Sequence, residues 1–366
     1  MNTRSEVQIK ALEAIGRSRK SGIEVSMGVG KTLIGLQHMS SLYTDVRKYL
    51  VVAPKRSIFT SWIDDMGKFK LTYLIPHITF STYRSLAKQD LDYDVVYLDE
   101  CHSLKATHAA WLKEFENKGG TIIGFTGTYP ERQNTEKGKM CNYFCPKVFE
   151  YTVDSAVQDN ILNDYEIIVH KINLDPASTI EKVGKFGKFN TSEVKEYAYW
   201  CARVDAANNP KALQITRIQR MKAIQNFRSK EEYARNLLDN LDVNHKAITF
   251  ANTKYQADMI CEYSYHSSNS DSENQSNLTM FKQGDILQLS AVEQLSEGVT
   301  IPDLRVGIIM HAYANNRKAA QKIGRLLRLN PNDKATIHIL CYNNTIDVEW
   351  VTNALSNFDQ TKIIWK

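Results

Sequence analysis

Cysteine is scarce in this chain, and no part of it is a long apolar run. The 366 residues include six cysteines, too few and too unevenly spaced for the disulfide framework of a small secreted protein, so we expect reduced thiols. Cys141 and Cys145 could form half of a metal site, but no second Cys or His pair follows at zinc-finger spacing. No stretch approaches the roughly 18 uncharged apolar residues of a membrane span, and the opening MNTRSEVQIK lacks the apolar segment of a signal peptide. These absences predict a cytoplasmic protein without a membrane partner.

The bulk composition is that of an ordinary folded protein. Hydrophobic residues make up 43% and charged residues 24% of the chain, enough apolar material for packed cores. Single cores rarely grow beyond roughly 250 residues, so this length favours two domains. A formal net charge of +5 permits a polyanionic partner without requiring one.

The order of apolar segments predicts an α/β fold in both halves. Short β-branched runs alternate with helix-compatible sequence, which is typical of parallel sheets. In the first half these runs are GIEVSM, KYLVVAP, HITFST, DVVYLDE and TIIGFTG; after about residue 240 they are HKAITFAN, DILQLS, RVGIIMHA and ATIHILCY. We expect one domain over 1–150 and a second over 151–366.

Two further segments have a different texture. Residues from about 176 to 240 are rich in Lys, Glu, Ala, Asn and Gln and poor in strand formers, so we expect a helical insertion that leads into the second domain. The run HSSNSDSENQSN, residues 266–277, is polar and low in complexity, which indicates a mobile surface loop. Deleting it is then expected to leave catalysis intact.

The run SMGVGKT indicates a phosphate-binding loop. It lies between an apolar strand and a helix. Gly28 and Gly30 would let backbone N–H groups surround phosphate oxygens, Lys31 would supply positive charge, and the Thr32 hydroxyl could bind Mg²⁺. Val25 stands where the usual pattern has its first glycine, and an ordinary glycine-rich turn is the alternative.

The run DVVYLDECHSL delivers two carboxylates to the end of an apolar strand. Asp99 could hold Mg²⁺, and Glu100 could polarise a water molecule that attacks the terminal phosphate. Asp-Glu after a strand is common by itself. Downstream of a phosphate-binding loop, it predicts a hydrolysis site.

A third element, QKIGRLLR, lies in the far half. Gln321, Arg325 and Arg328 follow helical spacing, so both guanidinium groups would project from one face. Such groups can stabilise a transferring phosphate. A solvated basic helix is the alternative for this run.

Taken in order, these runs resemble the motifs of superfamily 2 helicases of the DExH type. SMGVGKT resembles motif I, VVAPKRSIFTSW motif Ia, FSTYRSL motif Ib, DECH motif II and FTGT motif III; AITFANT resembles motif IV, LSEGVTIPDL motif V and QKIGRLLR motif VI. Gln8 stands upstream of motif I, where relatives carry a glutamine that reads adenine. The resemblance is to small phage and bacterial DNA helicases related to branch-migration enzymes and restriction-enzyme motors, and it implies two tandem RecA-like parallel-sheet domains.

The resemblance assigns roles position by position. Gly28, Val29, Gly30, Lys31 and Thr32 would surround the phosphates of ATP, Asp99 with Thr32 would hold Mg²⁺, and Glu100 would be the general base. His102 with Thr126 and Thr128 would couple the ATP site to the nucleic acid. From the second half, Gly298 would approach the nucleotide, Gln321 would contact the γ-phosphate region, and Arg325 and Arg328 would be arginine fingers. The strand-binding groove would include Pro54, Lys55, Arg56, Thr82, Tyr83, Thr249 and Asn252.

The implied activity is an ATP-dependent DNA helicase or translocase that binds its track largely without regard to sequence and works as a single chain. Thr300 departs from the family pattern, because many relatives have an acidic residue there. The open alternatives are an RNA helicase, and a nucleotide-gated nucleic-acid clamp with little turnover. A metabolic P-loop kinase would leave the second half unexplained.

Overall fold

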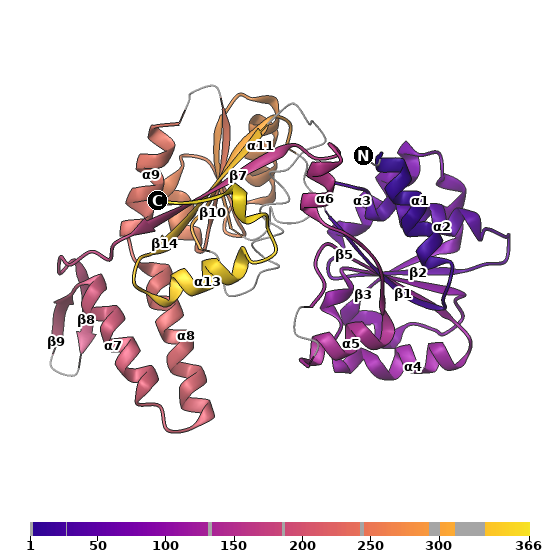
Figure 1. Ribbon diagram of the computed structural model, residues 1–366, viewed down its shortest axis with the longest axis horizontal. Helices are drawn as coiled ribbons and strands as arrows, with labels where there is room; N and C mark the ends of the chain where they lie inside the picture. The colour runs from indigo at the N-terminus through magenta and orange to yellow at the C-terminus, as the bar shows by residue number, and fades with distance from the viewer. Residues whose placement is uncertain are drawn as a thin grey trace. The chain divides into compact units, whose positions relative to one another are not determined.

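The computed structural model describes residues 3–26, 28–130, 134–184, 187–241, 245–292, 301–311 and 334–366. Within these residues the chain forms two compact units, the first ending at Asp164 and the second beginning at Tyr165 (Figure 1). We describe each unit by itself. No helix in the described ranges is long and apolar enough to cross a lipid bilayer.

The first unit is a parallel sheet with helices on both faces. Its strand order is β3-β2-β4-β5-β1-β6, and the pairs run parallel. Its elements are α1 (Arg4–Ile15), β1 (Lys20–Val25), α2 (Lys31–Ser41), β2 (Tyr49–Ala53), α3 (Ser57–Lys68), η1 (Thr72–His77), β3 (Ile78–Thr82), η2 (Tyr83–Lys88), β4 (Val95–Asp99), η3 (Cys101–Ser103), η4 (Ala106–His108), α4 (Ala109–Asn117), β5 (Thr121–Thr126), α5 (Glu136–Phe144), β6 (Lys147–Tyr151) and α6 (Val153–Gln158).

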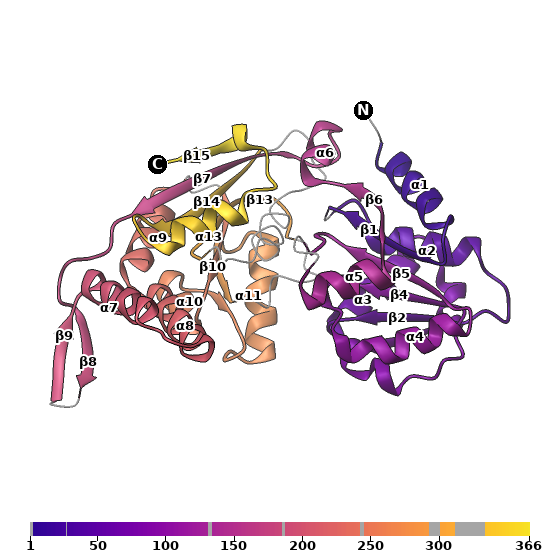
Figure 2. The ribbon, with the colours of Figure 1, turned by 60° about the horizontal axis from the view of Figure 1, so that its bottom comes forward.

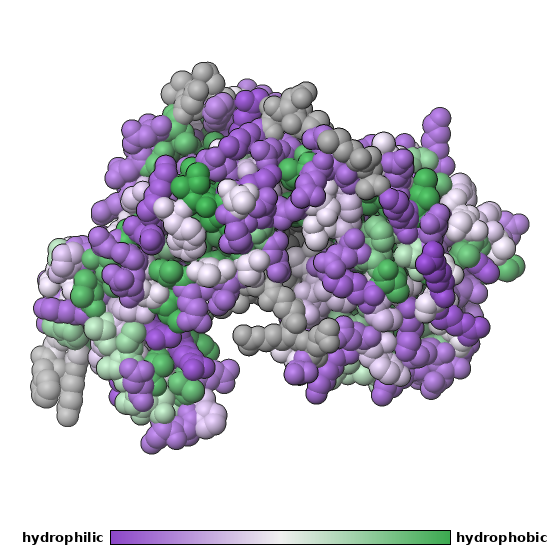
Figure 3. All heavy atoms as spheres, viewed as in Figure 1, coloured by the Kyte–Doolittle hydropathy of each residue, from purple (hydrophilic) through white to green (hydrophobic). Residues whose placement is uncertain are grey.

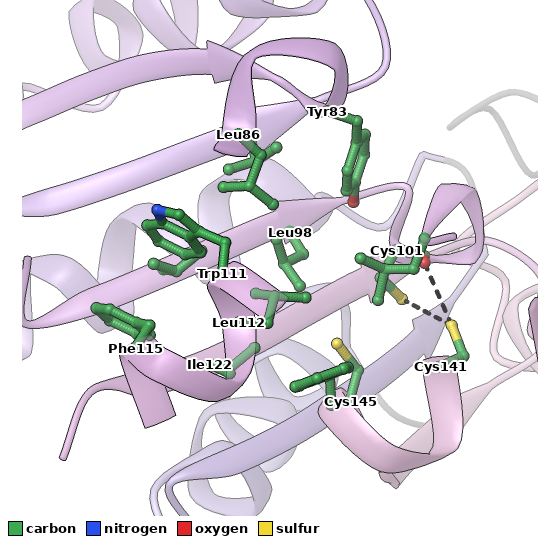
Figure 4. Close-up of a cluster of buried hydrophobic side chains, with 14 of the residues drawn as sticks. Tyr83, Leu86, Leu98, Cys101, Trp111, Leu112, Phe115, Ile122, Cys141 and Cys145 are labelled. Atoms are coloured by element: carbon green, nitrogen blue, oxygen red, sulfur yellow. Dashed lines mark hydrogen bonds between the residues drawn. The ribbon is translucent and has the colours of Figure 1, made fainter. Parts of the chain in front are cut away.

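Alternation along the central strands divides the core between the two faces. On β4, Val96 and Leu98 join a cluster with side chains of α4 and α5, whereas Tyr97 packs against Trp62 of α3. Figure 4 shows the first cluster, which includes the thiols of Cys101 and Cys141 with their sulfur atoms 3.8 Å apart. Both cysteines are buried thiols outside any disulfide, and they contribute to packing.

The second unit contains another sheet, in the order β11-β12-β10-β13-β14-β7-β15. Its interior strand β10 is parallel to both neighbours. The elements are β7 (Asp164–Ile172), β8 (Ile180–Gly184), β9 (Gly187–Thr191), α7 (Glu193–Asp205), α8 (Pro210–Asn226), α9 (Ser229–Asp239), β10 (Lys246–Ala251), α10 (Lys254–Ile260), β11 (Ser264–Tyr265), α11 (Asp271–Gln283), β12 (Gln288–Val292), β13 (Leu304–Ile309), β14 (Lys334–Tyr342), α13 (Ile346–Ala354), η6 (Gln360–Lys362) and β15 (Ile363–Trp365).

The predicted fold class is confirmed, and every strand predicted from an apolar run is present. Those runs are fully buried in β2, β4 and β10, which is why their hydrophobicity was continuous rather than alternating. Within the two large sheets, no run predicted β6, β7, β11 or β15, and three of these, β6, β11 and β15, lie at the edges. Edge strands have fewer neighbours, so less apolar sequence is required of them.

The predicted helical insertion is correct from Glu193 onward and wrong before it. Strands β8 (Ile180–Gly184) and β9 (Gly187–Thr191) pair antiparallel, and three helices follow, α7, α8 and α9. Gly184 and Gly187 flank the short connection, and Gly187 has a φ of +117°, a conformation that glycine adopts readily. The glycine spacing was the missed turn signal. The two views agree that α7 and α8 lie side by side (Figures 1 and 2).

The prediction of a mobile loop at 266–277 is wrong. Helix α11 begins inside this run, with Ser270 as its N-cap accepting a hydrogen bond from the Glu273 amide, and two of its asparagines are buried. The Asn274 side chain bonds both backbone groups of His266, and Asn277 donates to the Ser264 carbonyl. Polar side chains here satisfy backbone groups as caps do, which composition cannot distinguish from disorder. The expectation that the run is dispensable is therefore withdrawn.

A buried ion pair joins separate parts of the second unit. Lys230 of α9 is 0% exposed, and its Nζ donates to Asp347 Oδ2 at 2.5 Å and to the Met310 carbonyl at 3.1 Å. The same carboxylate oxygen accepts from the Tyr342 amide, and the Tyr342 ring lies 4.7 Å from Nζ. The pair therefore links α9 and α13 to the ends of β13 and β14.

Removing only one member of this pair should destabilise the second unit strongly. In Lys230→Met the Asp347 carboxylate, 1% exposed, is left buried without its cation, and such a loss typically costs about 3 to 5 kcal/mol. Hydrogen exchange of the β14 amides would measure the loss in this unit alone. The double variant K230M/D347N should recover part of it, and a single variant as stable as the wild type would contradict the assignment.

Candidate active site

The sheet order of the first unit brings three predicted motifs to one edge. Strands β4, β5 and β1 are neighbours and parallel, so their carboxyl ends meet at the same edge. Motif I follows β1, motif II follows β4 and motif III follows β5. Ligands of open α/β sheets bind at this edge.

The phosphate-binding loop has the backbone that its glycines predict. Gly28 and Gly30 have φ values of +88° and +102°, in the region that favours glycine. A Cβ on Gly30 would lie 2.9 Å from Gln8 Nε2. Any other residue at this position would therefore crowd Gln8 and strain the backbone. Lys31 and Thr32 open α2. Val25, the missing first glycine, is the last residue of β1 and pairs with Tyr151, where an extended backbone needs no glycine.

Two side chains of α1 donate hydrogen bonds to the backbone of this loop. Gln8, 5% exposed, donates from Nε2 to the Val29 carbonyl at 2.7 Å. Arg4, one turn earlier, donates from Nε to the same oxygen at 3.0 Å. The sequence analysis assigned Gln8 to the nucleotide and did not identify Arg4; their spacing of four residues on one helix face was the available signal.

Motif II lies directly against the loop. Asp99 ends β4 and is 7% exposed, and Lys31 Nζ lies 3.6 Å from Glu100 Oε1. Burial, followed by the charge of Glu100, raises the pKa of Asp99 to about 6. Glu100 has a φ of +51°, an uncommon backbone for a non-glycine residue, of the kind that clusters at functional sites.

Trp62 is a site residue that the sequence analysis missed. It is fully buried, and its Nε1 donates to Asp99 Oδ2 at 3.0 Å, while the Glu100 amide donates to Oδ1 at 2.9 Å. Both carboxylate oxygens are thus fixed. The indole also approaches Gly35 of α2 so closely that a Cβ there would lie 2.7 Å from it. Trp62 stands within the motif Ia run, but nothing in that run indicates that it contacts motif II.

We expect Trp62→Phe to lower turnover while leaving the fold intact. Phenylalanine retains much of the aromatic packing but cannot donate to Asp99, and loss of a group that orients a metal ligand typically costs about 10- to 100-fold in activity or metal affinity. Turnover measured against Mg²⁺ concentration should show a higher half-saturation point. The matched control is Trp111→Phe, which removes an indole donor to the Gln89 carbonyl on the other face of the sheet. An equal loss of turnover in both variants would show that the effect is a loss of stability and not a loss of the contact with Asp99.

The predicted coupling residues contact one another. His102 Nδ1 lies 2.9 Å from Thr126 Oγ1 and 3.3 Å from Glu100 Oε2. Thr126 Oγ1 also accepts from the Thr128 amide. Motifs II and III are therefore joined by side chains at the ends of β4 and β5.

Two buried hydroxyls at this edge lack a hydrogen-bond partner among the described residues, Ser26 Oγ and Thr128 Oγ1. Buried polar groups are usually satisfied, so these atoms fit a site that takes up a polar ligand. The remaining features agree with a nucleotide and Mg²⁺: a glycine loop at the start of a helix, a lysine, and the oxygen donors of Asp99 and Thr32, the ligand type that Mg²⁺ prefers. The residues present therefore fit both groups.

The groove residues predicted in the first unit divide into two kinds. Pro54, Lys55 and Arg56 follow β2 and Thr82 ends β3; because Ala53 pairs with Thr82, these two strand ends adjoin. Tyr83 is 6% exposed, and its hydroxyl donates to the Asp99 carbonyl at 3.0 Å. Its side chain thus supports motif II from within the core and does not lie on a surface groove.

In the second unit, Thr249 is 0% exposed inside β10, so its side chain is also in the core. Asn252 follows the same strand and is half-buried, with its amide donating to Gln256 Oε1. Gly298, Gln321, Arg325 and Arg328 lie outside the described residues, as does Thr300.

Comparison with known proteins agrees with these motifs. Residues 2–131 match the family described as type III restriction enzyme, res subunit, and residues 229–330 match the helicase conserved C-terminal domain. A search of curated proteins found no match.

Solved structures share the fold at low sequence identity. The type ISP restriction-modification enzyme LlaBIII bound to DNA has 13% identity and a TM-score of 0.63, over 98% of this chain and 31% of that one. The Mycobacterium smegmatis helicase Lhr bound to ssDNA and AMP-PNP has 13% identity and a TM-score of 0.57, over 99% of this chain and 48% of that one. An HsdR subunit fragment of a type I restriction enzyme from Vibrio vulnificus YJ016, described as putative, has 16% identity and a TM-score of 0.63, over 99% and 67%.

The chain thus spans less than half the length of LlaBIII and of Lhr. The two family matches fall on the two units in the order that the motifs predict. The two matches together place the chain among the superfamily 2 helicases, a family of ATP-hydrolysing nucleic-acid enzymes, and residues 2–131 relate its first half to a restriction-enzyme subunit.

Proposed function

We propose that this chain is a DNA motor, which hydrolyses ATP and uses the energy to move along or remodel DNA, including branched intermediates. The observation that carries the proposal is the distance of 3.6 Å between Lys31 Nζ and Glu100 Oε1. It joins a phosphate-binding lysine to a candidate base at the ligand-binding edge of the sheet. An ordinary glycine-rich turn would not require a carboxylate at that place.

The roles of the residues follow from their chemistry. Lys31 and the loop residues Gly28, Val29 and Gly30 bind the phosphates, and Gln8 supports the loop beside the base. Mg²⁺, held by Asp99 and Thr32, would neutralise phosphate charge. Glu100 accepts a proton from the attacking water, and its contact with His102 passes the state of the site to Thr126 and Thr128.

The second half completes the site in this proposal. Gly298 approaches the nucleotide, Gln321 contacts the γ-phosphate region, and Arg325 and Arg328 stabilise the transferring phosphate. Closure of the two units on ATP and their release after hydrolysis would be a population shift driven by the γ-phosphate.

DNA is favoured as the track. Support comes from the related proteins named above as bound to DNA or ssDNA. Lys55 and Arg56 are exposed after β2, beside Thr82, where they can contact phosphates irrespective of sequence. Binding of this kind weakens as salt rises. RNA is the alternative track, because backbone contacts distinguish the two mainly through the 2′-OH.

The deciding experiment is ATP turnover by the purified chain alone and then with single-stranded DNA, branched DNA or RNA at matched salt. Strong stimulation by DNA is expected. Stimulation by RNA alone would show that the track is RNA and not DNA. Measurable ATP binding with low, unstimulated turnover would favour the nucleotide-gated clamp over the motor.

A further inference from the structure

Residues 180–226 of the second unit, here called the arm, carry an unusual share of the charge. The arm comprises the hairpin β8–β9 and the helices α7 and α8. It contains nine lysines and arginines against four acids, a net charge of +5, which equals the formal net charge of the whole chain. All other residues together carry no net charge, so the arm holds the net positive charge of the chain and would attract an anionic partner.

The acids of the arm are mostly withdrawn from solvent or paired. Glu193 is 2% exposed and Glu196 is 8% exposed; Glu193 accepts from Ser229, and Glu196 accepts from Lys182. Glu181 pairs with Lys188. The negative charge is thus largely compensated within the unit, while the surplus of positive charge remains.

That surplus is concentrated on α8, which contains four basic residues and no acid. Lys211, Arg217 and Lys222 are exposed, and none of them forms an ion pair within the described parts of the chain. Helical spacing puts Lys211 and Lys222 on one stripe with Ile215, which is 50% exposed. Only three of the 17 residues of α8 are buried, so most of this helix faces solvent and is accessible to a partner.

A groove runs beside this stripe. It has a volume of about 770 Å³ and lies between α8 and α13, with walls from Leu213, Arg217 and Met221 on one side and Ile346 and Trp350 on the other. One acid, Glu349, and a second guanidinium, Arg220, also line it. Figure 3 shows hydrophobic and hydrophilic side chains intermixed over the helices of the arm.

These features match an unpaired nucleic-acid strand. Apolar and aromatic walls take up bases, and arginines at the rim bind the phosphates between them. A duplex keeps its bases stacked inside and would leave the groove unused. Phe189 and Tyr199, 52% and 54% exposed, add further rings to the same arm.

We propose that the arm is a second binding surface for single-stranded DNA, in which Lys211, Arg217 and Lys222 contact phosphates and the groove between α8 and α13 receives bases. The proposal rests on the proposed DNA-motor function, since it gives the motor a contact outside its motif groove. Such a contact would retain the strand while the motif contacts are released.

The test reverses the three charges in K211E/R217E/K222E. Its matched control is R17E/K118E/K139E, which makes the same change of charge at three exposed positions of the first unit. Fluorescence anisotropy with labelled single-stranded DNA over a salt series would measure affinity. Three lost phosphate contacts should lower the slope of log K against log salt by about 2, and we expect at least a tenfold loss of affinity at low salt.

ATP turnover separates this proposal from the one on which it rests. We expect unchanged turnover without DNA, and a DNA concentration for half-maximal stimulation raised at least tenfold in the arm variant. The neutral variant K211Q/R217Q/K222Q should shift in the same direction by less, and circular dichroism would verify folding of each.

The other outcomes are distinct. If DNA stimulates the turnover of the wild type and the arm variant binds DNA equally well, the proposed role of the arm is wrong and the proposed motor function stands. An unstimulated wild type whose DNA binding depends on the arm would overturn the motor and support the arm. Equal losses in the arm variant and the control, or binding of RNA or duplex DNA in preference to a single strand, would overturn the arm as proposed.

Discussion

Glu100→Gln should reduce ATP turnover by about 10² to 10⁴-fold, the usual contribution of a general base, while ATP still binds. Glutamine has nearly the same shape as glutamate but cannot accept the proton of the attacking water. The side chain is positioned for this role by its place after β4 and by Lys31 Nζ at 3.6 Å. Burial and, after it, the charge of Glu100 raise the pKa of Asp99; removing that charge disfavours no contact of the nucleotide, so nucleotide binding should not weaken.

Single-turnover hydrolysis and equilibrium binding of a labelled nucleotide would separate these effects. Glu116→Gln is the control. It removes a carboxylate of the same unit that pairs with Lys20, the first residue of β1, at the opposite end of the strand from the motifs. Lys31→Ala should lose turnover as well, with weaker nucleotide binding. Normal turnover in Glu100→Gln would refute the assignment of the base.

Arg328→Ala should lower turnover by about 10³ to 10⁵-fold, the range measured for arginine fingers, with nucleotide binding largely retained. A planar guanidinium stabilises charge that develops on the transferring phosphate, so its removal acts on the transition state more than on the bound ATP. Arg325→Ala should act in the same direction. Both residues follow from motif VI, which lies outside the described residues.

Lys322→Ala is the matched control within the same run. If residues 321–328 are helical, as their spacing predicts, Lys322 lies about 100° around the axis from Gln321 and so off the shared face. An unchanged rate in Arg328→Ala, or the same loss in Lys322→Ala, would return the run to a solvated basic helix.

The sequence was most informative where a local pattern suffices. Apolar runs predicted the inner strands because parallel strands are buried on both faces, and glycine positions predicted the backbone of the phosphate loop because few other residues adopt its φ values. Ordered motifs identified the family. Polar composition misled at 266–277, because Asn274 and Asn277 are buried as partners of backbone groups, and it hid the hairpin β8–β9.

The sequence by itself therefore determined the α/β class and the family, and it indicated the residue types of the proposed nucleotide site at Lys31, Asp99 and Glu100. Only the tertiary structure decided that Trp62 and the Glu100 amide fix the Asp99 carboxylate, that Arg4 joins Gln8 behind the loop, and that Tyr83 and Thr249 face the core. It also brought α8 beside α13 to form the groove of the arm. The reason is that a motif records neighbours along the chain, whereas these contacts join residues that only sheet pairing and helix packing bring together.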